Sequence, residues 1–205
     1  MMDALPEMQG LVLAGGFSRR MKRDKASLVY SSAGEPQWRI TARLLGEVTG
    51  TARISVRPGQ QLEGHRNGDP ELMPDQGSSQ GPLTGILTAL HSRPGKAILV
   101  VACDLPLLSK DILTTLIEAR GTSNAVAFRS SSDGLPEPLC AIYEPSMAGV
   151  LEDYLRQGIR CPRKILIREE NSIRLLKLPR ADALENANTP EDFSRLRDLI
   201  VSRSS

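Results

Sequence analysis

Short apolar runs are spaced along the chain between polar segments, and several of them have the length and pattern of β-strands. Residues 10–14 and 97–102 are apolar without interruption, which is typical of buried strands. Residues 53–57 alternate between polar and apolar side chains and stop at Pro58-Gly59, which also predicts a strand. Three further strand candidates lie at residues 125–128, 139–143 and 173–178.

Between these runs the apolar positions recur at intervals of three and four residues, which is the spacing of a helix that buries one face. The pattern predicts helices after Pro36, over residues 83–90, after Ser109, over residues 146–156 and after Thr189. Thr189 suits the N-cap of the last helix, because a proline and two acidic residues follow it. We expect residues 202–205 to fray. Residues 60–80 are polar, contain five glycines or prolines and predict a long loop.

Strands that alternate with helices predict an α/β fold with a mostly parallel central sheet flanked by helices. The run at residues 97–102 is apolar at every position, which indicates a central strand covered on both faces. A length of 205 residues suits one domain. We therefore expect residues 1–205 to form a single Rossmann-like domain, with its ligand site beyond the carboxyl ends of the strands.

The composition narrows the range of partners. Lys and Arg total 26 against 24 Asp and Glu, and the net charge of +2 does not predict a general nucleic-acid binder. The sequence has no run of about 18 apolar residues, and residues 1–9 lack the basic start and apolar run of a signal peptide. No pair of the three cysteines has the spacing of metal ligands, and three widely spaced cysteines do not predict a disulfide framework. We expect a cytoplasmic protein that binds neither nucleic acid nor a membrane.

Two glycines, Gly15 and Gly16, follow the first predicted strand and open a strongly basic segment. Five of the seven residues from 19 to 25 are basic and one is acidic. Glycine lets backbone N–H groups approach an anion closely, and the surrounding charge suits a triphosphate. The segment lacks the three spaced glycines of the dinucleotide fingerprint and the Gly-Lys-Ser/Thr of a P-loop. A solvated basic loop on a glycine turn is the alternative interpretation.

Polar residues follow other predicted elements. Asp104 comes after the longest buried run, and a carboxylate there either completes a turn or holds a hard cation such as Mg²⁺. Its position beside the glycine segment in the same sheet favours the cation. Asp75 lies in the long polar loop, ahead of the sequence Gly81-Pro82-Leu83-Thr84-Gly85. Asn186 and Asn188 precede the last helix, where their side chains either cap it or bind a ligand.

Together these segments resemble the MobA-type nucleotidyltransferases, the molybdenum cofactor guanylyltransferases, within the wider group of nucleotide-diphospho-sugar transferase-like proteins. The resemblance extends over nearly the whole chain. Its most specific part is the signature Leu13-Ala14-Gly15-Gly16, Arg20-Met21 and Asp24-Lys25. Cys103-Asp104-Leu105-Pro106 is similar to the family's metal-binding strand end. Residues 186–191, Asn-Ala-Asn-Thr-Pro-Glu, are similar to its C-terminal segment, which favours the molybdenum cofactor branch.

The resemblance implies transfer of GMP from GTP to the terminal phosphate of molybdopterin, with release of pyrophosphate and with Mg²⁺ as cofactor. It implies nucleotide contacts from Leu13, Ala14, Gly15, Gly16, Lys25, Asp75 and Asp104. Asp104 would hold the metal, and Lys25 with Arg19 or Arg20 would offset charge on the leaving pyrophosphate. The pterin side would be formed by Gly85, Asn186 and Asn188. A phosphate monoester has a second pKa of about 6, so this acceptor needs no general base.

Two positions depart from the family pattern. Lys22 stands where the signature has glycine, and Arg57 stands where the related guanylyltransferases carry an asparagine near the base. Three alternatives stay open: a CTP-using molybdopterin cytidylyltransferase, a sugar- or polyol-phosphate nucleotidyltransferase, and a non-catalytic nucleotide-binding regulatory homologue. The resemblance also admits other molybdenum cofactor biosynthesis proteins as partners.

Overall fold

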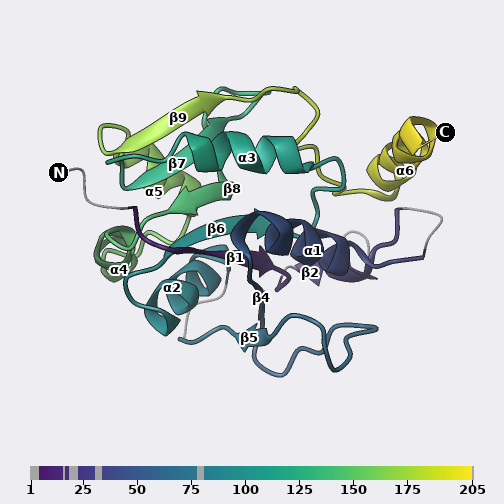
Figure 1. The fold of residues 1–205 in the computed structure, drawn as a ribbon, viewed down its shortest axis with the longest axis horizontal. Coiled ribbons are helices and arrows are strands. Elements are labelled where there is room, and N and C mark those ends of the chain that lie inside the picture. Colours follow the sequence, from purple (N-terminus) through teal and green to yellow (C-terminus); the bar gives the residue numbers. More distant parts are fainter. Residues whose placement is uncertain (1–4, 16, 19–22, 31–33, 78–80, 205) are drawn as a thin grey trace.

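The architecture was analysed in a computed structural model, which describes residues 5–15, 17–18, 23–30, 34–77 and 81–204, with the backbone alone at 17–18, 23–24 and 204. Within these ranges the chain forms one α/β domain around a seven-stranded sheet (Figure 1). Gly16, Arg19, Arg20 and Lys22 lie outside the described residues. No helix in the described ranges has the length and apolar character needed to cross a membrane.

The sheet is mostly parallel, as the sequence predicts. Its strand order is β5-β4-β1-β6-β8-β7-β9. The strands are β1 (Met8–Leu13), β4 (Ala52–Val56), β5 (Leu72–Pro74), β6 (Ala97–Ala102), β7 (Ala125–Arg129), β8 (Pro136–Tyr143) and β9 (Ile173–Lys177). Neighbouring strands run parallel except at β8, which is antiparallel to both β6 and β7.

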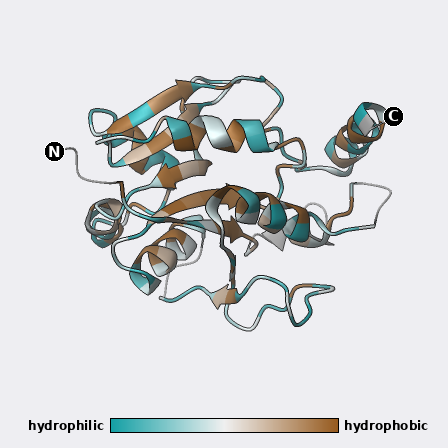
Figure 2. Ribbon diagram, in the orientation of Figure 1, coloured by the Kyte–Doolittle hydropathy of each residue, from teal (hydrophilic) through white to brown (hydrophobic). Residues whose placement is uncertain are grey.

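Strand β6 lies in the middle of the sheet, and all six of its residues are buried. Leu99 and Val101 pack into one apolar cluster, whereas Ile98 and Val100 pack into another. The two clusters lie on opposite faces of the sheet, because successive side chains of a strand point to opposite sides. The fully apolar run therefore forms a central strand covered on both faces, as predicted. Figure 2 shows apolar residues along the strands and polar ones on the outer sides of the helices.

Helices cover both faces of the sheet. Those on the Leu99 face are α1 (Gln37–Thr49) and α3 (Lys110–Glu118). Those on the Ile98 face are α2 (Pro82–Ser92), α4 (Met147–Arg156) and α5 (Pro162–Arg168). The sequence predicts four of these five helices. Helix α5 has seven residues, which is too short for a clear helical period.

Two short elements follow the first strand, at the segment rich in basic residues. Strands β2 (Phe17–Ser18) and β3 (Arg23–Asp24) pair with each other, antiparallel, in a sheet of their own. A 3₁₀ turn, η1 (Lys25–Ser27), comes next, and its Ala26 is buried in the apolar cluster that contains Trp38 and Ala42 of α1.

The long polar segment differs from the prediction, because it contains a strand. Within it, β5 pairs in parallel with β4, and Met73 is buried. Three residues that end in proline give little strand signal in a sequence, although proline is well tolerated at the edge of a sheet. The consequence is that Asp75 directly follows a strand instead of lying in an open loop.

The C-terminal helix α6 (Pro190–Ser204) packs beside the sheet on a small apolar cluster of its own (Figure 1). Its buried Leu196 contacts a group that includes Leu28, Tyr30 and Leu107. The predicted start is confirmed, because the Thr189 hydroxyl accepts a hydrogen bond from the Asp192 backbone N–H at 3.1 Å. The helix extends through Ser204, its residues 201–203 are exposed, and the fraying expected of residues 202–205 stays a prediction.

Candidate functional site

The carboxyl ends of four neighbouring parallel strands meet at one edge of the sheet. Leu13 of β1 pairs with Ala102 of β6, so the residues that follow these two strands are neighbours. Gly15 follows β1 and Asp104 follows β6, whereas Arg57 and Asp75 directly follow β4 and β5. The fold thus brings candidate residues from distant parts of the sequence to the edge where open α/β sheets bind ligands.

Lys25 is the centre of a polar network at this edge. Its Nζ donates to Asp104 Oδ2 at 2.8 Å and to Asn188 Oδ1 at 2.7 Å. Asn188 Nδ2 in turn donates to Asn186 Oδ1 at 2.9 Å. The side chains of Lys25 and Asp104 are 16% and 15% exposed, so both keep one side open to an incoming group. Four of the predicted site residues are therefore in one connected group.

The side chain of Asn188 does not cap helix α6, which was one of the two roles considered for it. Its backbone N–H donates to Asp192 Oδ2 at 3.1 Å, and Asp192 and Thr189 complete the cap of α6. The Asn188 side chain is not used in this cap and instead binds Lys25. The start of α6 is thus stabilised independently, and the asparagine amide is available to the site.

A second group surrounds Asp75. Ser55 Oγ donates to Asp75 Oδ1 at 2.6 Å, and the Asp75 backbone N–H donates to Val56 O at 2.8 Å. Burial raises the pKa of the Asp75 carboxyl, and the hydrogen bond from Ser55 opposes part of that rise. The environment therefore favours the neutral acid more than water does, which is common for groups that meet a ligand.

Gly85 lies with Asp75, whereas the resemblance places it on the pterin side with the two asparagines. A Cβ at this position would lie 2.4 Å from Ser55 Oγ, 2.9 Å from Leu13 Cδ2 and 3.2 Å from Asp75 Oδ1. Helix α2 thus approaches the sheet so closely here that only glycine fits without a shift of its neighbours. We infer that Gly85 keeps the hydrogen bond between Ser55 and Asp75 in place.

Arg57 is held against the glycine turn by Gln60, which the sequence analysis did not identify. Gln60 Oε1 accepts from the Arg57 backbone N–H at 3.0 Å and from Arg57 Nε at 3.2 Å. Gln60 Nε2 donates to Ala14 O at 3.1 Å. A Cβ at Gly15 would lie 3.5 Å from Arg57 Cγ and 3.7 Å from Asp75 Oδ2. A cation and a half-buried acid therefore flank Gly15. No sequence pattern marks Gln60 or Ser55, because each acts through a tertiary contact.

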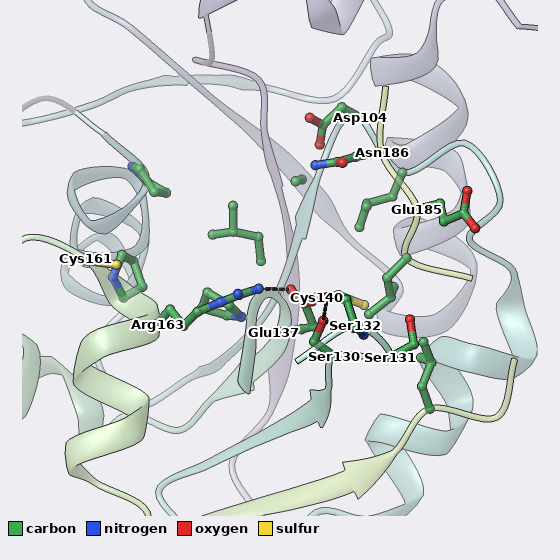
Figure 3. Close-up of a pocket in the computed structure, with 18 of the residues that line it drawn as sticks. Asp104, Ser130, Ser131, Ser132, Glu137, Cys140, Cys161, Arg163, Glu185 and Asn186 are labelled. Carbon is green, nitrogen blue, oxygen red and sulfur yellow. Dashed lines mark hydrogen bonds and ion pairs between the residues drawn. The ribbon is translucent and has the colours of Figure 1, made fainter. Parts of the chain in front are cut away.

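A cavity of about 570 Å³ opens beside the lysine network. Asp104 and Asn186 line one side of it, and the turn between β7 and β8 and the start of α5 line the other (Figure 3). Its size is in the range of pockets that hold small organic ligands. Within the described ranges, no group of three His, Cys, Asp or Glu side chains is placed to hold a metal, so Asp104 is a single carboxylate ligand candidate.

The mostly parallel sheet carries Gly15, a lysine–aspartate pair and a half-buried acid at its strand ends, and a cavity opens beside the pair. This is the organisation of a nucleotidyltransferase. Comparison with known families gives the same class. The chain belongs to the family of the MobA-like NTP transferase domain, whose model matches residues 10–172.

Individual relatives are consistent with this family. The chain is 36% identical over 190 residues to the molybdenum cofactor biosynthesis bifunctional protein of Synechocystis sp., covering 92% of this chain and 53% of that protein, about half its length. It is 31% identical to the molybdenum cofactor guanylyltransferase of Pseudomonas aeruginosa, covering 96% of this chain and 98% of that protein. A crystal structure of molybdopterin-guanine dinucleotide biosynthesis protein A from Archaeoglobus fulgidus has the same fold, with a TM-score of 0.73, 24% identity and coverage of 95% and 99% of the two chains.

Replacement of Gly85 by alanine should disturb the Asp75 group. The new Cβ would overlap Ser55 Oγ and Leu13 Cδ2, and overpacking of this kind costs about 1–3 kcal/mol. We expect a lower midpoint of urea unfolding. The matched control is Gly149→Ala in α4, where a Cβ meets nothing within 4 Å and helix propensity favours alanine by up to about 1 kcal/mol. Equal stability of Gly85→Ala and the wild type would contradict the close approach.

Replacement of Asp75 by asparagine should stabilise the protein at neutral pH. A raised pKa in the folded state means that stability falls as pH rises from the ordinary Asp pKa through the folded one. Asparagine carries no charge and still accepts from Ser55. The melting temperature of Asp75→Asn should therefore exceed that of the wild type above this window, and the difference should vanish in acid.

The control for this prediction is Asp69→Asn. The side-chain hydrogen bond from Arg39 is the main cause that lowers the pKa of Asp69, so its carboxylate contributes stability above the ordinary Asp pKa. Asp69→Asn should lower the melting temperature at neutral pH, and this loss should shrink as pH falls through the folded pKa. If the difference in melting temperature between Asp75→Asn and the wild type did not change with pH, burial would not be raising the pKa of Asp75.

Proposed function

We propose that the protein transfers GMP from GTP to the terminal phosphate of molybdopterin and releases pyrophosphate. The observation that carries the proposal is the Lys25–Asp104–Asn188 network at the edge of the cavity. It places a cation, a carboxylate and two amides where a nucleotide triphosphate and a second substrate would meet. The relatives named as molybdenum cofactor guanylyltransferases support the choice of substrates.

The nucleotide is assigned to the ends of β1, β4 and β5. Backbone N–H groups around Gly15 and Gly16 would hold its phosphates, and Leu13 and Ala14 would lie beside the nucleotide. Gly16 and Arg19, outside the described residues, stay predicted contributors. Arg57 has only hydrogen-bond donors, which suit the O6 and N7 acceptors of guanine and also the O2 acceptor of cytosine. Asp75 supplies acceptors for the donor groups of either base. The choice of GTP over CTP therefore rests on the relatives named as guanylyltransferases.

Asp104 would hold Mg²⁺, and the residues present fit that ion. A single carboxylate is sufficient, because Mg²⁺ binds proteins through one or two carboxylates and takes its other ligands from phosphates and water. Mg²⁺ bound there would neutralise charge on the nucleotide phosphates. Lys25 lies within 2.8 Å of the same carboxylate, so its ammonium group is also close enough to offset phosphate charge. Asn186 and Asn188 would bind on the acceptor side of this group.

In the proposed reaction an oxygen of the acceptor phosphate attacks the α-phosphorus of GTP. A new P–O–P linkage forms, the bond from the α-phosphorus to the bridging oxygen breaks, and pyrophosphate leaves with that oxygen. The attacking monoester is largely dianionic at neutral pH, so no general base is required. Both histidines are engaged elsewhere, His65 with Pro70 O and His91 with Glu152. Catalysis then rests on orientation and charge neutralisation.

The choice of nucleotide is tested by turnover with GTP, CTP, ATP and UTP, with molybdopterin as acceptor and Mg²⁺ present. Pyrophosphate release is the readout, and kcat/KM should be highest for GTP. A preference for CTP would overturn the guanylyl assignment and leave nucleotidyl transfer in place. No turnover with any nucleotide, in protein that still binds GTP, would favour a regulatory homologue. The cytoplasmic location and other biosynthetic proteins as partners stay predictions.

Lys25→Ala and Asp104→Asn should each lower kcat/KM for GTP by about 100-fold or more, because each removes charge stabilisation at the phosphates. Because most of each side chain is buried, removal of one partner also costs stability, so the melting temperature of each variant is measured beside its activity. Matched controls are Lys177→Ala and Asp198→Asn, which remove exposed charges outside the site. Activity near that of the wild type in either site variant would remove that residue from the proposed machinery.

A further inference from the structure

The far side of the cavity carries a second set of charged residues that the proposed reaction does not use. Glu137 lies at the start of β8, and Arg163 lies in the first turn of α5. Arg163 Nη2 donates to Glu137 Oε2 at 2.8 Å, and its Nη1 donates to Asp133 Oδ2 at 3.1 Å. Figure 3 shows Arg163 reaching the Glu137 carboxylate across the cavity from Asp104 and Asn186.

The Glu137 carboxylate is held at one oxygen and available at the other. Arg163 fixes Oε2, whereas Oε1 accepts no hydrogen bond from the described residues. The side chain is 24% exposed and lines the cavity, so a ligand in the cavity can reach the carboxylate. An ionised carboxylate is an acceptor only, and each oxygen accepts more than one hydrogen bond. Glu137 therefore suits a ligand with two neighbouring N–H donors.

We propose that Glu137 binds the 2-amino-4-oxo edge of the acceptor's pterin ring and that Arg163 is the positioning residue for this carboxylate. The proposal rests on the proposed function, because it takes a pterin phosphate as the acceptor. On that edge the ring N3–H and the 2-amino group are adjacent donors. A carboxylate matches them with two charge-assisted hydrogen bonds. The terminal phosphate then points to Lys25 and Asp104 at the other side of the cavity.

A second glutamate–arginine pair in the cavity wall, Glu185 with Arg195, is less suited to binding the pterin ring. Glu185 Oε2 is paired with Arg195 at 2.6 Å. Glu185 lies next to Asn186, on the side where the phosphate is assigned, as Figure 3 shows. An acid at that end would repel a phosphate rather than bind a ring. Glu185 therefore serves as the matched control for Glu137.

Guanine has the same pair of donors, on N1 and the 2-amino group, so the base of GTP is a second source of this chemistry. The two rings would bind at different places, because the guanine base is assigned to the ends of β1, β4 and β5 and the pterin to Glu137. A substitution at Glu137 should therefore change pterin binding and leave the KM for GTP unchanged. If Glu137→Gln raised the KM for GTP and left pterin binding unchanged, the proposal would be overturned.

The experiment compares two probes, 6-hydroxymethylpterin and the corresponding 6-hydroxymethyl-lumazine, by calorimetric titration of the full chain. The lumazine has a carbonyl in place of the 2-amino group and faces the carboxylate with an acceptor. The wild type should bind the pterin at least about tenfold more tightly than the lumazine, as expected when a charged hydrogen bond is lost. Glu137→Gln should reduce that ratio to within about twofold, and Glu185→Gln should leave it unchanged.

The role of Arg163 is tested by the same ratio of pterin affinity to lumazine affinity. Arg163→Ala should lower the discrimination between pterin and lumazine, and Arg163→Lys should restore part of it. If the role of Arg163 were purely structural, Arg163→Ala would weaken the binding of both probes equally. Equal binding of the two probes to the wild type, or an unchanged ratio in Glu137→Gln, would overturn the proposal. Nucleotide preference is measured separately, so a failure of GTP as substrate is distinguishable from a failure at Glu137.

Discussion

The parallel pairing of β1 with β6 is the constraint on which the rest of the site depends. Both strands are buried, and their register brings the residues after Leu13 and Ala102 to the same edge. Gly15 and Asp104 become neighbours only because the two strands run in the same direction. Lys25 returns to this edge from the segment that follows the glycine turn. A slip of one residue in this register would exchange the two faces of a strand and remove Asp104 from the site.

The C-terminal segment completes the site through packing remote from the chemistry. Helix α6 is held by the apolar cluster around Tyr30 and Leu196, and its N-terminus is stabilised by its own cap. These contacts fix the backbone at Asn188, and from that backbone its side chain reaches Lys25. The side chains of Lys25 and Asp104 each keep about 15% of their surface exposed. Their charges therefore remain available for ligand binding, while apolar contacts hold the segments together.

The sequence predicts the sheet, most of the helices and the residues at the ends of β1 and β6, because buried strands and their glycine or acidic ends are strong local patterns. It does not predict the place of Asp75, since β5 is three residues long and looks like loop. It groups Gly85 with the asparagines, whereas the approach of α2 puts it beside Ser55. Gln60 and Glu137 carry no local signal at all, because their roles come from contacts between distant segments.

The reversed strand β8 divides the edge of the sheet into two halves with different architecture. On one side the ends of β1, β4, β5 and β6 are carboxyl termini of parallel strands. On the other side β8 contributes its amino end, so the cavity wall there is built from Glu137 and the turn that precedes it. That turn joins two adjacent strands, and its Ser131 Oγ donates to Ala181 O at 2.9 Å in the segment that leads to α6. A change in the length or sequence of this one turn would therefore reshape the cavity wall and leave the four parallel strand ends with Gly15, Arg57, Asp75 and Asp104 as they are.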